Sequence, residues 1–305
     1  MLTSLDYYRV FYYVAKHRNF TRAADVLMTS QPTVTRTVKM LERDLECRLF
    51  ERDKRGVTLT AEGELLYSYV APAYERILRG EEKLVGKTSL RGGSVYVSAT
   101  ETSLHCFLLE KLGTFHDRYP QIRLKVTNVS TTQAIENVAI GRSDLAFVAS
   151  PAEVPEPLKC TPVSTFRDIL VGNARYSELA RGSYDLKELR KYPLISSSRN
   201  ASTTYMFYQG VFAAAGLEFR PEIELNTADL IIPFIKRNLG IGFVPEELAQ
   251  PALKAGEIVG ISLVSPIPER VVSVVYNPQY PLSAAARELL GLVRPEKARP
   301  ASLSS

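Results

Sequence analysis

Polar side chains with the chemistry of nucleic-acid recognition gather in one short stretch near the start of the sequence: Gln31, Thr33, Thr35, Arg36 and Lys39. Their amide, hydroxyl, guanidinium and ammonium groups can hydrogen bond to base edges and neutralise phosphates. Apolar residues recur among them at spacings of four, three and four, namely Val34, Val38, Leu41 and Leu45. This spacing predicts a helix with one buried stripe and the polar set on the opposite face. We interpret the segment as a DNA recognition helix; an ordinary solvated amphipathic helix is the alternative.

The flanking residues predict the elements that position this helix. Ser30 has the side chain of an N-cap, and Pro32 falls in the first turn, where a backbone N–H has no intrahelical partner. Residues 19–27 predict a shorter helix capped by Asn19, and residues 28–30 connect the two helices as in a helix-turn-helix. Residues 49–52 and 57–59 flank a turn, which predicts a hairpin wing whose basic side chains reach the sugar-phosphate backbone: Arg52, Lys54 and Arg55.

Residues 11–63 resemble the N-terminal domain of LysR-type transcriptional regulators. The matching positions are Phe11, Val14, Ala15, Phe20, Thr21, Arg22, Ala23, Ala24, Leu27, Ser30, Gln31, Pro32, Val34, Arg36, Lys39, Leu41, Glu42, Leu45, Leu49, Phe50, Glu51, Arg52, Gly56, Leu59, Thr60, Glu62 and Gly63. The resemblance implies a winged helix-turn-helix that contacts DNA through Thr21, Arg22, Ser30, Gln31, Pro32, Thr33, Thr35, Arg36, Lys39, Arg52, Lys54 and Arg55. Glu46 departs from the family, which usually has glycine there; a positive φ would cost a non-glycine residue about 1 kcal/mol.

Most of the net positive charge lies at the same end of the chain. The 305 residues carry a net charge of +5, and residues 1–60 contribute +4 of it, with 11 Lys/Arg against 7 Asp/Glu. Phosphate contacts require this kind of asymmetry. A membrane-surface role would need a basic amphipathic anchor, which the sequence does not contain. It also has no leader pattern and no apolar run of about 18 residues, so we expect a cytoplasmic protein.

The sequence offers little for catalysis. The histidines, His17, His105 and His116, are not spaced as metal ligands, and no GxSxG motif occurs. The cysteines, Cys47, Cys106 and Cys160, form no CxxC pair. We therefore expect no enzyme activity, metal or cofactor. Two alternatives to an effector-controlled DNA-binding regulator remain: a small-molecule (solute) binding protein without DNA function, and a redox-sensing regulator acting through Cys106.

A long helix is predicted from Ala61 to about Val85. Its apolar residues near heptad spacing are Leu66, Val70, Ala73, Ile77 and Leu84. So long a stripe on a small domain requires a partner. In the family, the matching linker helix pairs antiparallel with its copy in a second subunit, so the resemblance implies a dimer or tetramer. Pro72 is expected to kink the helix or to mark a junction between two shorter helices.

From Ser94 onward, strands alternate with helices, which predicts an α/β architecture with mostly parallel sheets. The element order resembles the two-lobed, periplasmic-binding-protein-like effector domain of the same family. We expect a winged helix-turn-helix domain over residues 1–60, a linker helix over 61–90 and an effector domain over 91–294. Lobe I would comprise about 91–163 and 267–294, and lobe II about 164–266. Residues 295–305 would form a disordered tail.

Hydroxyl and amide side chains follow several predicted strands, where parallel sheets bind ligands because strand ends meet helix N-termini. These candidates are Thr100, Thr102, Ser103, Asn128, Ser130, Ser196, Ser197, Ser198, Thr203, Asn226 and Thr227. With Arg199 as a counter-charge, the set favours a small carboxylate or oxyanion. Glu101 instead favours an amine-bearing ligand, and helix capping alone is the alternative for each Ser or Thr.

These features together predict a sequence-specific transcriptional regulator that binds double-stranded promoter DNA as a dimer or tetramer. A small-molecule effector in the cleft would favour one arrangement of the two lobes. The change would move the subunits and so alter the DNA bend or a contact with RNA polymerase.

Overall fold

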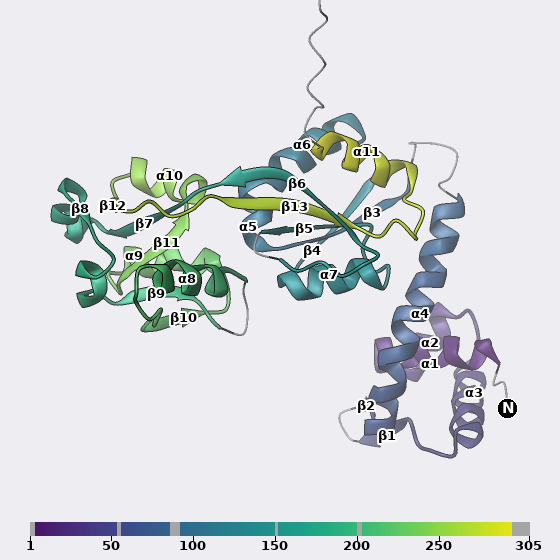
Figure 1. Ribbon diagram of the computed structural model, residues 1–305. Coiled ribbons are helices and arrows are strands. Elements are labelled where there is room, and N and C mark those ends of the chain that lie inside the picture. The colour runs from purple at the N-terminus through teal and green to yellow at the C-terminus, as the bar shows by residue number, and fades with distance from the viewer. Residues whose placement is uncertain (1–3, 54–55, 86–91, 150–151, 200–202, 295–305) are drawn as a thin grey trace, which may run out of the picture. The chain divides into compact units, whose positions relative to one another are not determined.

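The computed structural model describes residues 4–53, 56–85, 92–149, 152–199 and 203–294. The chain divides into two compact units, Met1–Leu84 and Val85–Ser305, and each is described by itself. The wing residues Lys54 and Arg55 and the predicted tail over 295–305 lie outside the described residues (Figure 1).

The first unit contains three short helices, a hairpin and one long helix (Figure 1). These are α1 (Leu5–His17), α2 (Phe20–Val26), α3 (Gln31–Asp44), β1 (Phe50–Asp53), β2 (Gly56–Leu59) and α4 (Ala61–Val85). Buried apolar side chains of the short helices and the residues entering the hairpin form a single core: Val10, Phe11, Val14, Ala15, Phe20, Ala23, Ala24, Val34, Val38, Leu41, Leu49 and Phe50. The predicted winged helix-turn-helix is therefore confirmed.

Helix α4 continues as one helix through Pro72, so the predicted junction between two shorter helices is not formed. Gly63 in its first turn allows the helix to pass close to the residues that lead into the hairpin. A Cβ added at Gly63 would lie 2.1 Å from the carbonyl oxygen of Leu49, much closer than van der Waals contact allows. Glycine is therefore required at this crossing.

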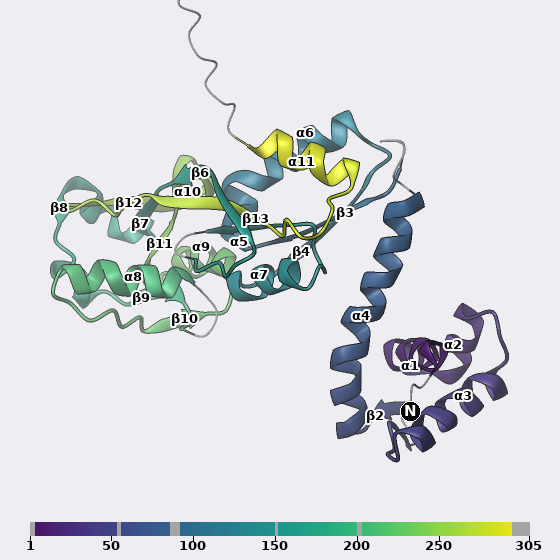
Figure 2. The same ribbon diagram turned by 45° about the vertical axis from the view of Figure 1, so that its right-hand side comes forward.

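The second unit begins with a five-stranded sheet that forms lobe I. Its strands, in spatial order, are β4 (Arg123–Asn128), β3 (Ser94–Ala99), β5 (Leu145–Ala149), β13 (Arg270–Tyr276) and β6 (Lys159–Phe166). Helices α6 (Leu109–Arg118) and α11 (Ala284–Val293) cover one face, and α7 (Thr131–Ala139) covers the other (Figures 1 and 2). A single turn of α-helix, α5 (Glu101–Ser103), and a π-helical turn, η1 (Leu104–Leu108), precede α6. Each face of the sheet has its own apolar cluster, which fixes the strand ends relative to the helices.

Lobe II is built on a six-stranded sheet. Its strands, in spatial order, are β10 (Ile223–Leu225), β9 (Leu194–Ser197), β11 (Ile241–Pro245), β7 (Asp168–Asn173), β12 (Ile258–Leu263) and β8 (Ser183–Tyr184). The helices are η2 (Ala174–Arg181), η3 (Glu188–Lys191), α8 (Thr203–Ala214), η4 (Ala228–Leu230), α9 (Ile231–Lys236) and α10 (Glu246–Lys254). One apolar cluster joins α8 to the sheet, and a second joins α9 and α10 to it.

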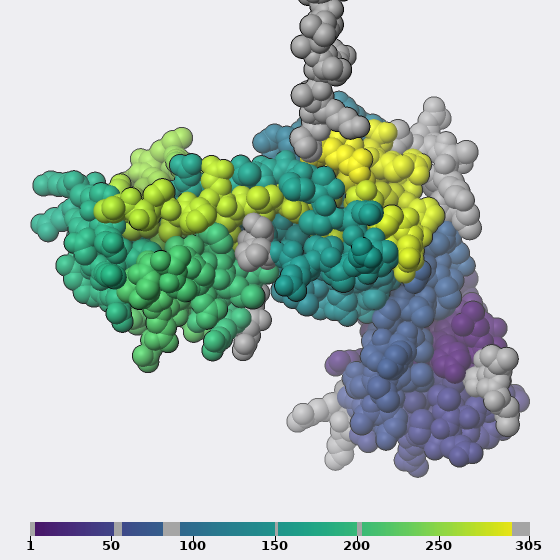
Figure 3. Space-filling model, viewed as in Figure 1, coloured from purple at the N-terminus to yellow at the C-terminus, as the bar shows by residue number. Residues whose placement is uncertain are grey.

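The chain crosses between the lobes twice, from β6 to β7 at Arg167 and from β12 back to β13. The predicted lobe boundary at residues 163 and 164 falls inside β6. The stretch linking β12 to β13 lies at the surface, in yellow-green in Figure 3.

Both sheets are mostly parallel, as predicted: in each, one strand runs opposite to the others, β13 between β5 and β6 in lobe I and β7 between β11 and β12 in lobe II. Strand β6 escaped prediction because it contains Pro162 and several polar residues, a composition that suits an edge strand.

Candidate DNA-binding face and effector cleft

Helix α3 has one apolar face and one polar face, as the sequence predicts. Val34, Val38 and Leu41 are at most 2% exposed, and they hold the helix against α1 and α2. The polar side chains lie on the opposite, accessible face. Those that are exposed are Ser30, Pro32, Thr33, Arg36 and Lys39, with Gln31 and Thr35 half-buried.

A shallow groove runs along this accessible face. It is lined by Gln31, Pro32, Thr35, Arg36, Lys39, Met40 and Arg43. Gln31 Nε2 donates to Thr35 Oγ1 at 3.0 Å, so these two side chains orient each other before any base is contacted. Arg43 is a further cation of the groove that was not predicted, although its spacing of four residues from Lys39 places it on the same face. The groove thus combines donors for base edges with charges for phosphates.

The start of α3 is fixed by Ser30, whose Oγ accepts from the backbone N of Thr33 at 3.4 Å. The other end is tied to the hairpin by Glu42, whose Oε1 accepts from the backbone N of Leu49 at 2.8 Å and of Phe50 at 3.3 Å. Glu46 lies between the end of α3 and the hairpin. It has φ = 54°, so this non-glycine residue does adopt the left-handed conformation. The helix and the hairpin are therefore held as one unit by side-chain contacts.

The remaining predicted DNA contacts do not line this groove. Thr21 and Arg22 are exposed in the first turn of α2, where Asn19 Oδ1 accepts from the backbone N of Arg22 at 2.9 Å. The side chain of Arg52 and the residues Lys54 and Arg55 lie outside the described part of the structure.

The predicted dimerisation stripe on α4 is divided by the fold. Leu66 and Val70 pack against the core of their own unit, whereas Ile77 is 42% exposed and Ala73 is exposed. The exposed apolar side chains recur every four residues: Leu65 at 63%, Tyr69 at 73%, then Ala73 and Ile77. The surface available to a partner is this row of four, called the α4 row below. Leu84 lies where side chains are not described.

A cavity of about 240 Å³ lies between the two lobes, where strands β3, β4, β9 and β10 end. Lobe I contributes Thr100, Glu101, Thr102, Asn128, Val129, Ser130, Thr131 and Ala149. Lobe II contributes Ser197, Thr203, Thr204, Asn226, Thr227 and Ala228. The lining is rich in hydroxyl and amide groups, and in the described residues it includes Glu101 but no lysine or arginine. This cavity is called the cleft below.

Eight of the predicted effector-binding residues line the cleft: Thr100, Thr102, Asn128, Ser130, Ser197, Thr203, Asn226 and Thr227. Two of these, Thr100 and Ser130, also cap helices, accepting from the backbone N of Ser103 and of Gln133. Capping and lining are therefore not exclusive roles here.

Four predicted residues do not line the cleft. Ser196 and Ser198 flank Ser197 in the chain, and successive residues of an extended segment point to opposite sides. Ser103 is buried, and its Oγ donates to the carbonyl oxygen of Phe147 at 2.7 Å. Arg199 is exposed, with its guanidinium carbon 5.9 Å from the ring centre of Tyr205. The counter-charge predicted at Arg199 is thus outside the cleft.

Hydrogen bonds cross the cleft from lobe to lobe. The hydroxyls of Thr131 and Thr203 lie 3.3 Å apart, and the backbone N of Ala228 donates to Glu101 Oε2 at 3.0 Å. Burial, together with the nearby charge of Asp229, raises the pKa of Glu101. The bond places a lobe I carboxylate at the start of η4 in lobe II, a contact that no local sequence pattern could indicate.

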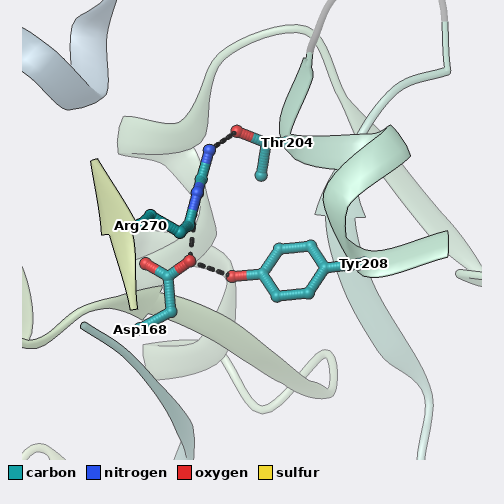
Figure 4. Close-up of polar contacts among 4 residues, drawn as sticks. All are labelled: Asp168, Thr204, Tyr208 and Arg270. Carbon is teal, nitrogen blue, oxygen red and sulfur yellow. Dashed lines mark hydrogen bonds and ion pairs between the residues drawn. The ribbon is translucent and has the colours of Figure 1, made fainter. Parts of the chain in front are cut away.

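A buried ion pair joins the two crossing strands next to the cleft (Figure 4). Arg270 Nη1 donates to Asp168 Oδ2 at 3.0 Å, and the two side chains are 1% and 0% exposed. Arg270 Nη2 donates to Thr204 Oγ1 at 2.9 Å, and Tyr208 OH donates to Asp168 Oδ2 at 2.6 Å. The two strands that cross between the lobes, β7 and β13, are called the hinge. Because Thr204 lines the cleft, these contacts connect the hinge to the cleft wall.

The same ion pair is enclosed by aromatic rings. The Arg270 guanidinium carbon lies 5.0 Å from the ring centre of Phe166 and 4.9 Å from that of Phe207. Burial raises the pKa of Tyr208 well above its ordinary value, so its hydroxyl remains a donor. Neither Asp168 nor Arg270 was a candidate from sequence, because their pairing depends on residues far apart in the chain.

Cys106, the residue of the redox alternative, has an environment opposite to that of a reactive thiol. Burial raises its pKa to about 12, and the charges of Glu247 and Asp168 act in the same direction. Reactive cysteines have lowered pKa values and electropositive surroundings. Redox sensing through Cys106 therefore finds no support in this structure.

The fold and these two sites define a class of protein in which a winged helix-turn-helix precedes a two-lobed ligand-binding domain. Comparison with family models agrees with this description. Residues 5–64 match the bacterial regulatory helix-turn-helix protein model of the lysR family, and residues 88–298 match the LysR substrate binding domain. The chain belongs to the LysR family of DNA-binding transcriptional regulators with an effector-binding domain. The alternative of a solute-binding protein without DNA function is therefore wrong.

Individual relatives align with the chain over nearly their whole length. A probable RuBisCO transcriptional regulator of Nostoc sp. is 28% identical, covering 97% of this chain and 89% of its own. The uncharacterized HTH-type regulator YbhD of Escherichia coli is 26% identical, covering 96% and 92%. These relatives are named as regulators rather than enzymes, which agrees with the sequence analysis.

Solved structures confirm the fold. Full-length CbnR in complex with its target DNA has a TM-score of 0.74 at 19% identity, covering 95% of this chain and 98% of its own. The probable transcriptional regulator PA0477 from Pseudomonas aeruginosa has a TM-score of 0.68 at 21% identity, covering 95% and 96%. Among the described residues, no helix is both long and apolar enough to span a membrane.

Proposed function

We propose that this regulator reads operator DNA in the cytoplasm with the accessible face of α3, and that a small molecule in the cleft controls the outcome. The observation that carries the proposal is the division of α3 into a buried apolar stripe and a groove bearing Gln31, Arg36 and Lys39. Amide and guanidinium groups on one helix face match the edges of adenine and guanine in the major groove. CbnR, which has the same fold, was solved in complex with its target DNA, and this supports DNA binding as the role of such a fold.

Arg36→Ala and Gln31→Ala test this reading directly. Each substitution leaves the buried stripe intact and should weaken specific operator binding by about 1–3 kcal/mol if the side chain makes a bidentate base contact. The operator is first found by genomic footprinting, and affinities are then measured by quantitative footprinting at fixed salt.

Arg9→Ala is the matched control, because it also removes an exposed arginine from the first unit but does so on α1, where Arg9 pairs with Asp6. We expect its operator affinity to stay near that of the wild type. Equal affinities for Arg36→Ala and the wild-type chain would refute the recognition assignment.

We propose that the functional unit is a dimer, or a tetramer built from dimers, joined through the α4 row. Exposed apolar side chains at a spacing of four form a continuous strip along one side of a helix. Pairing through this strip would remove it from water, which is the usual reason for such a strip to exist. Two recognition helices would then meet DNA half-sites separated by one or more helical turns.

The effector is proposed to be a small carboxylate or oxyanion, for which hydroxyls and the N-terminus of α7 provide donors. Glu101 is the observation that favours the second candidate, an amine-bearing ligand, because it is the charged residue of the cleft lining.

Glu101→Gln distinguishes these two ligand classes. The substitution should strengthen binding of an anion, because it removes a like charge, and should weaken binding of an amine, because it removes the counter-charge. Calorimetric titration with metabolite pools fractionated by charge, followed by single compounds, shows whether the substitution strengthens or weakens binding. An anion bound more weakly by Glu101→Gln than by the wild type would refute the carboxylate assignment.

Effector binding would act by changing the relative population of lobe arrangements. The bonds from Thr131 to Thr203 and from Glu101 to Ala228 exist only while the lobes approach each other across the cleft. A ligand that replaces or reinforces these bonds has different affinities for the two arrangements, as any population shift requires. The shift would move the paired subunits and so change the DNA bend or the contact with RNA polymerase.

A further inference from the structure

A second cavity, of about 340 Å³, opens inside lobe II and shares no lining residue with the cleft. Its interior is formed by buried apolar side chains of the lobe II core: Leu170, Leu186, Leu189, Leu194, Phe212, Ile241 and Phe243. Its rim carries Arg190, Tyr192, Glu218, Arg220 and Glu222. An apolar interior beneath a charged rim is the usual form of a small-molecule site.

The size of this cavity suits a small organic molecule. An engineered apolar cavity of about 150 Å³ binds benzene, and the lobe II cavity is about twice that size. It therefore has room for an apolar body of about ten carbon atoms.

The rim determines the chemistry of the polar end. Arg190 and Arg220 are exposed, and within the described residues neither guanidinium has a carboxylate at ion-pair distance. Glu222 lies on the same rim, but its Oε2 already accepts from the backbone N of Leu194 at 2.7 Å. Two available guanidiniums match one carboxylate, and the nearby Glu218 and Glu222 disfavour a dianion.

We propose that the lobe II cavity is a second ligand site, which takes an amphipathic monocarboxylate with its apolar body inside and its carboxylate between Arg190 and Arg220. The wall of this site leads to the hinge. Phe243 stacks on Tyr208 at a ring-centre distance of 4.8 Å, and Tyr208 donates to Asp168 of the buried ion pair. A ligand packed against Phe243 is thus two side chains away from the strands that join the lobes.

The test uses the full chain and 4-phenylbutanoate as the probe, with 4-phenylbutanol as the neutral analogue of the same apolar body. Binding is measured by calorimetry and by the shift in thermal unfolding temperature. We expect the acid to bind and to raise the unfolding temperature as its concentration increases, because a ligand that binds only the folded state stabilises it. The alcohol should bind at least about tenfold more weakly, since it lacks the charge that the guanidiniums recognise.

Variants locate the probe. Arg190→Gln with Arg220→Gln should weaken binding of the acid by about tenfold or more. Lys187→Gln, which removes an exposed cation of the same segment that does not line the cavity, should leave it unchanged, and so should the cleft variant Thr102→Val. All these side chains except Thr102 are exposed, so the rim variants are expected to fold.

The proposal would be overturned by no binding of the acid at millimolar concentration, by equal binding of the acid and the alcohol, or by unchanged binding in the double arginine variant. A loss of binding in Thr102→Val would assign the probe to the cleft and would equally overturn it. None of these measurements involves DNA, so failure here and failure of the proposed operator contacts are separate outcomes.

Discussion

Arg270 and Asp168 form an ion pair of 3.0 Å that is closed to solvent, and the residues beside them, Arg167 and Glu269, form an exposed pair of the same length with the charges in reverse order. Both pairs bridge the two crossings between the lobes. The two pairs have the same length, but the side chains of the outer pair are 57% and 54% exposed. Comparing them therefore isolates the effect of burial.

We therefore expect very different costs from breaking the two pairs. Asp168→Ala should destabilise the chain by about 3–5 kcal/mol, because it leaves the guanidinium of Arg270 buried without a counter-charge. Glu269→Ala should cost at most about 1 kcal/mol, because its pair is solvated. Urea unfolding measures both costs. The double variant Asp168→Leu with Arg270→Met should be less destabilised than Asp168→Ala, because it leaves no unpaired charge in the core. Equal costs for the inner and outer pairs would contradict this account of the hinge.

Two glycines of α4 should respond to alanine in opposite directions. Gly63→Ala should destabilise by about 1–3 kcal/mol, because the added Cβ would overlap the carbonyl of Leu49. Gly80→Ala should stabilise by up to about 1 kcal/mol, because nothing lies within 4 Å of its added Cβ and alanine is the better helix former. Thermal unfolding of the two variants gives both signs, and stabilisation by Gly63→Ala would show that the crossing is looser than described.

The α4 row should control subunit association. Tyr69→Lys and Ile77→Lys each place a charge in the exposed apolar strip and should shift the chain toward smaller species in sedimentation velocity. Ser68→Lys adds the same charge beside the row, at an exposed residue that the strip does not include, and should leave association unchanged. Association that survives both row substitutions would place the interface elsewhere.

Glu101 should give the chain a pH-dependent stability. Its pKa is raised above the ordinary value of 4.5 by burial and by Asp229, so the folded state holds this proton more tightly than the unfolded state does. The stabilising contribution is fully present below pH 4.5 and is lost as pH rises through the raised pKa. Relative to Glu101→Gln, the wild type should thus lose stability over this window in urea titrations. Asp229→Asn should move the window to lower pH, and a window unaffected by both substitutions would refute the assignment.

Most of the first unit was predictable from local patterns. Ser30 and Asn19 were recognisable as caps, and the spacing of Val34, Val38 and Leu41 assigned one face of α3 to the core. These features depend on residues a few positions apart, where the 3.6-residue period of a helix decides which side chains meet. The α4 stripe was less accurate because heptad spacing alone cannot tell a face packed on its own unit from one left exposed, and Leu66 and Val70 proved to be internal.

The cleft was predictable in position but not in charge. Strand ends located Thr100, Asn128, Ser197 and Asn226, because the carboxyl ends of parallel strands meet at one edge. Alternation along β9 and the residues after it excluded Ser196 and Ser198, and the path of the chain after β9 carried Arg199 away. Glu101 is the charged residue of the cleft lining instead.

The sequence by itself determined helix α3 and its two faces, the order of the elements and the edge of each sheet where the cleft forms, since local spacing and strand direction suffice for these. Tertiary structure alone decided the partners of Asp168, Glu101 and Glu42, and it alone enclosed the second cavity of lobe II. Asp168 and Arg270 are 102 positions apart, and Glu101 and Ala228 are 127 apart. Contacts over such separations follow from how whole elements pack together, which local patterns of residues do not specify.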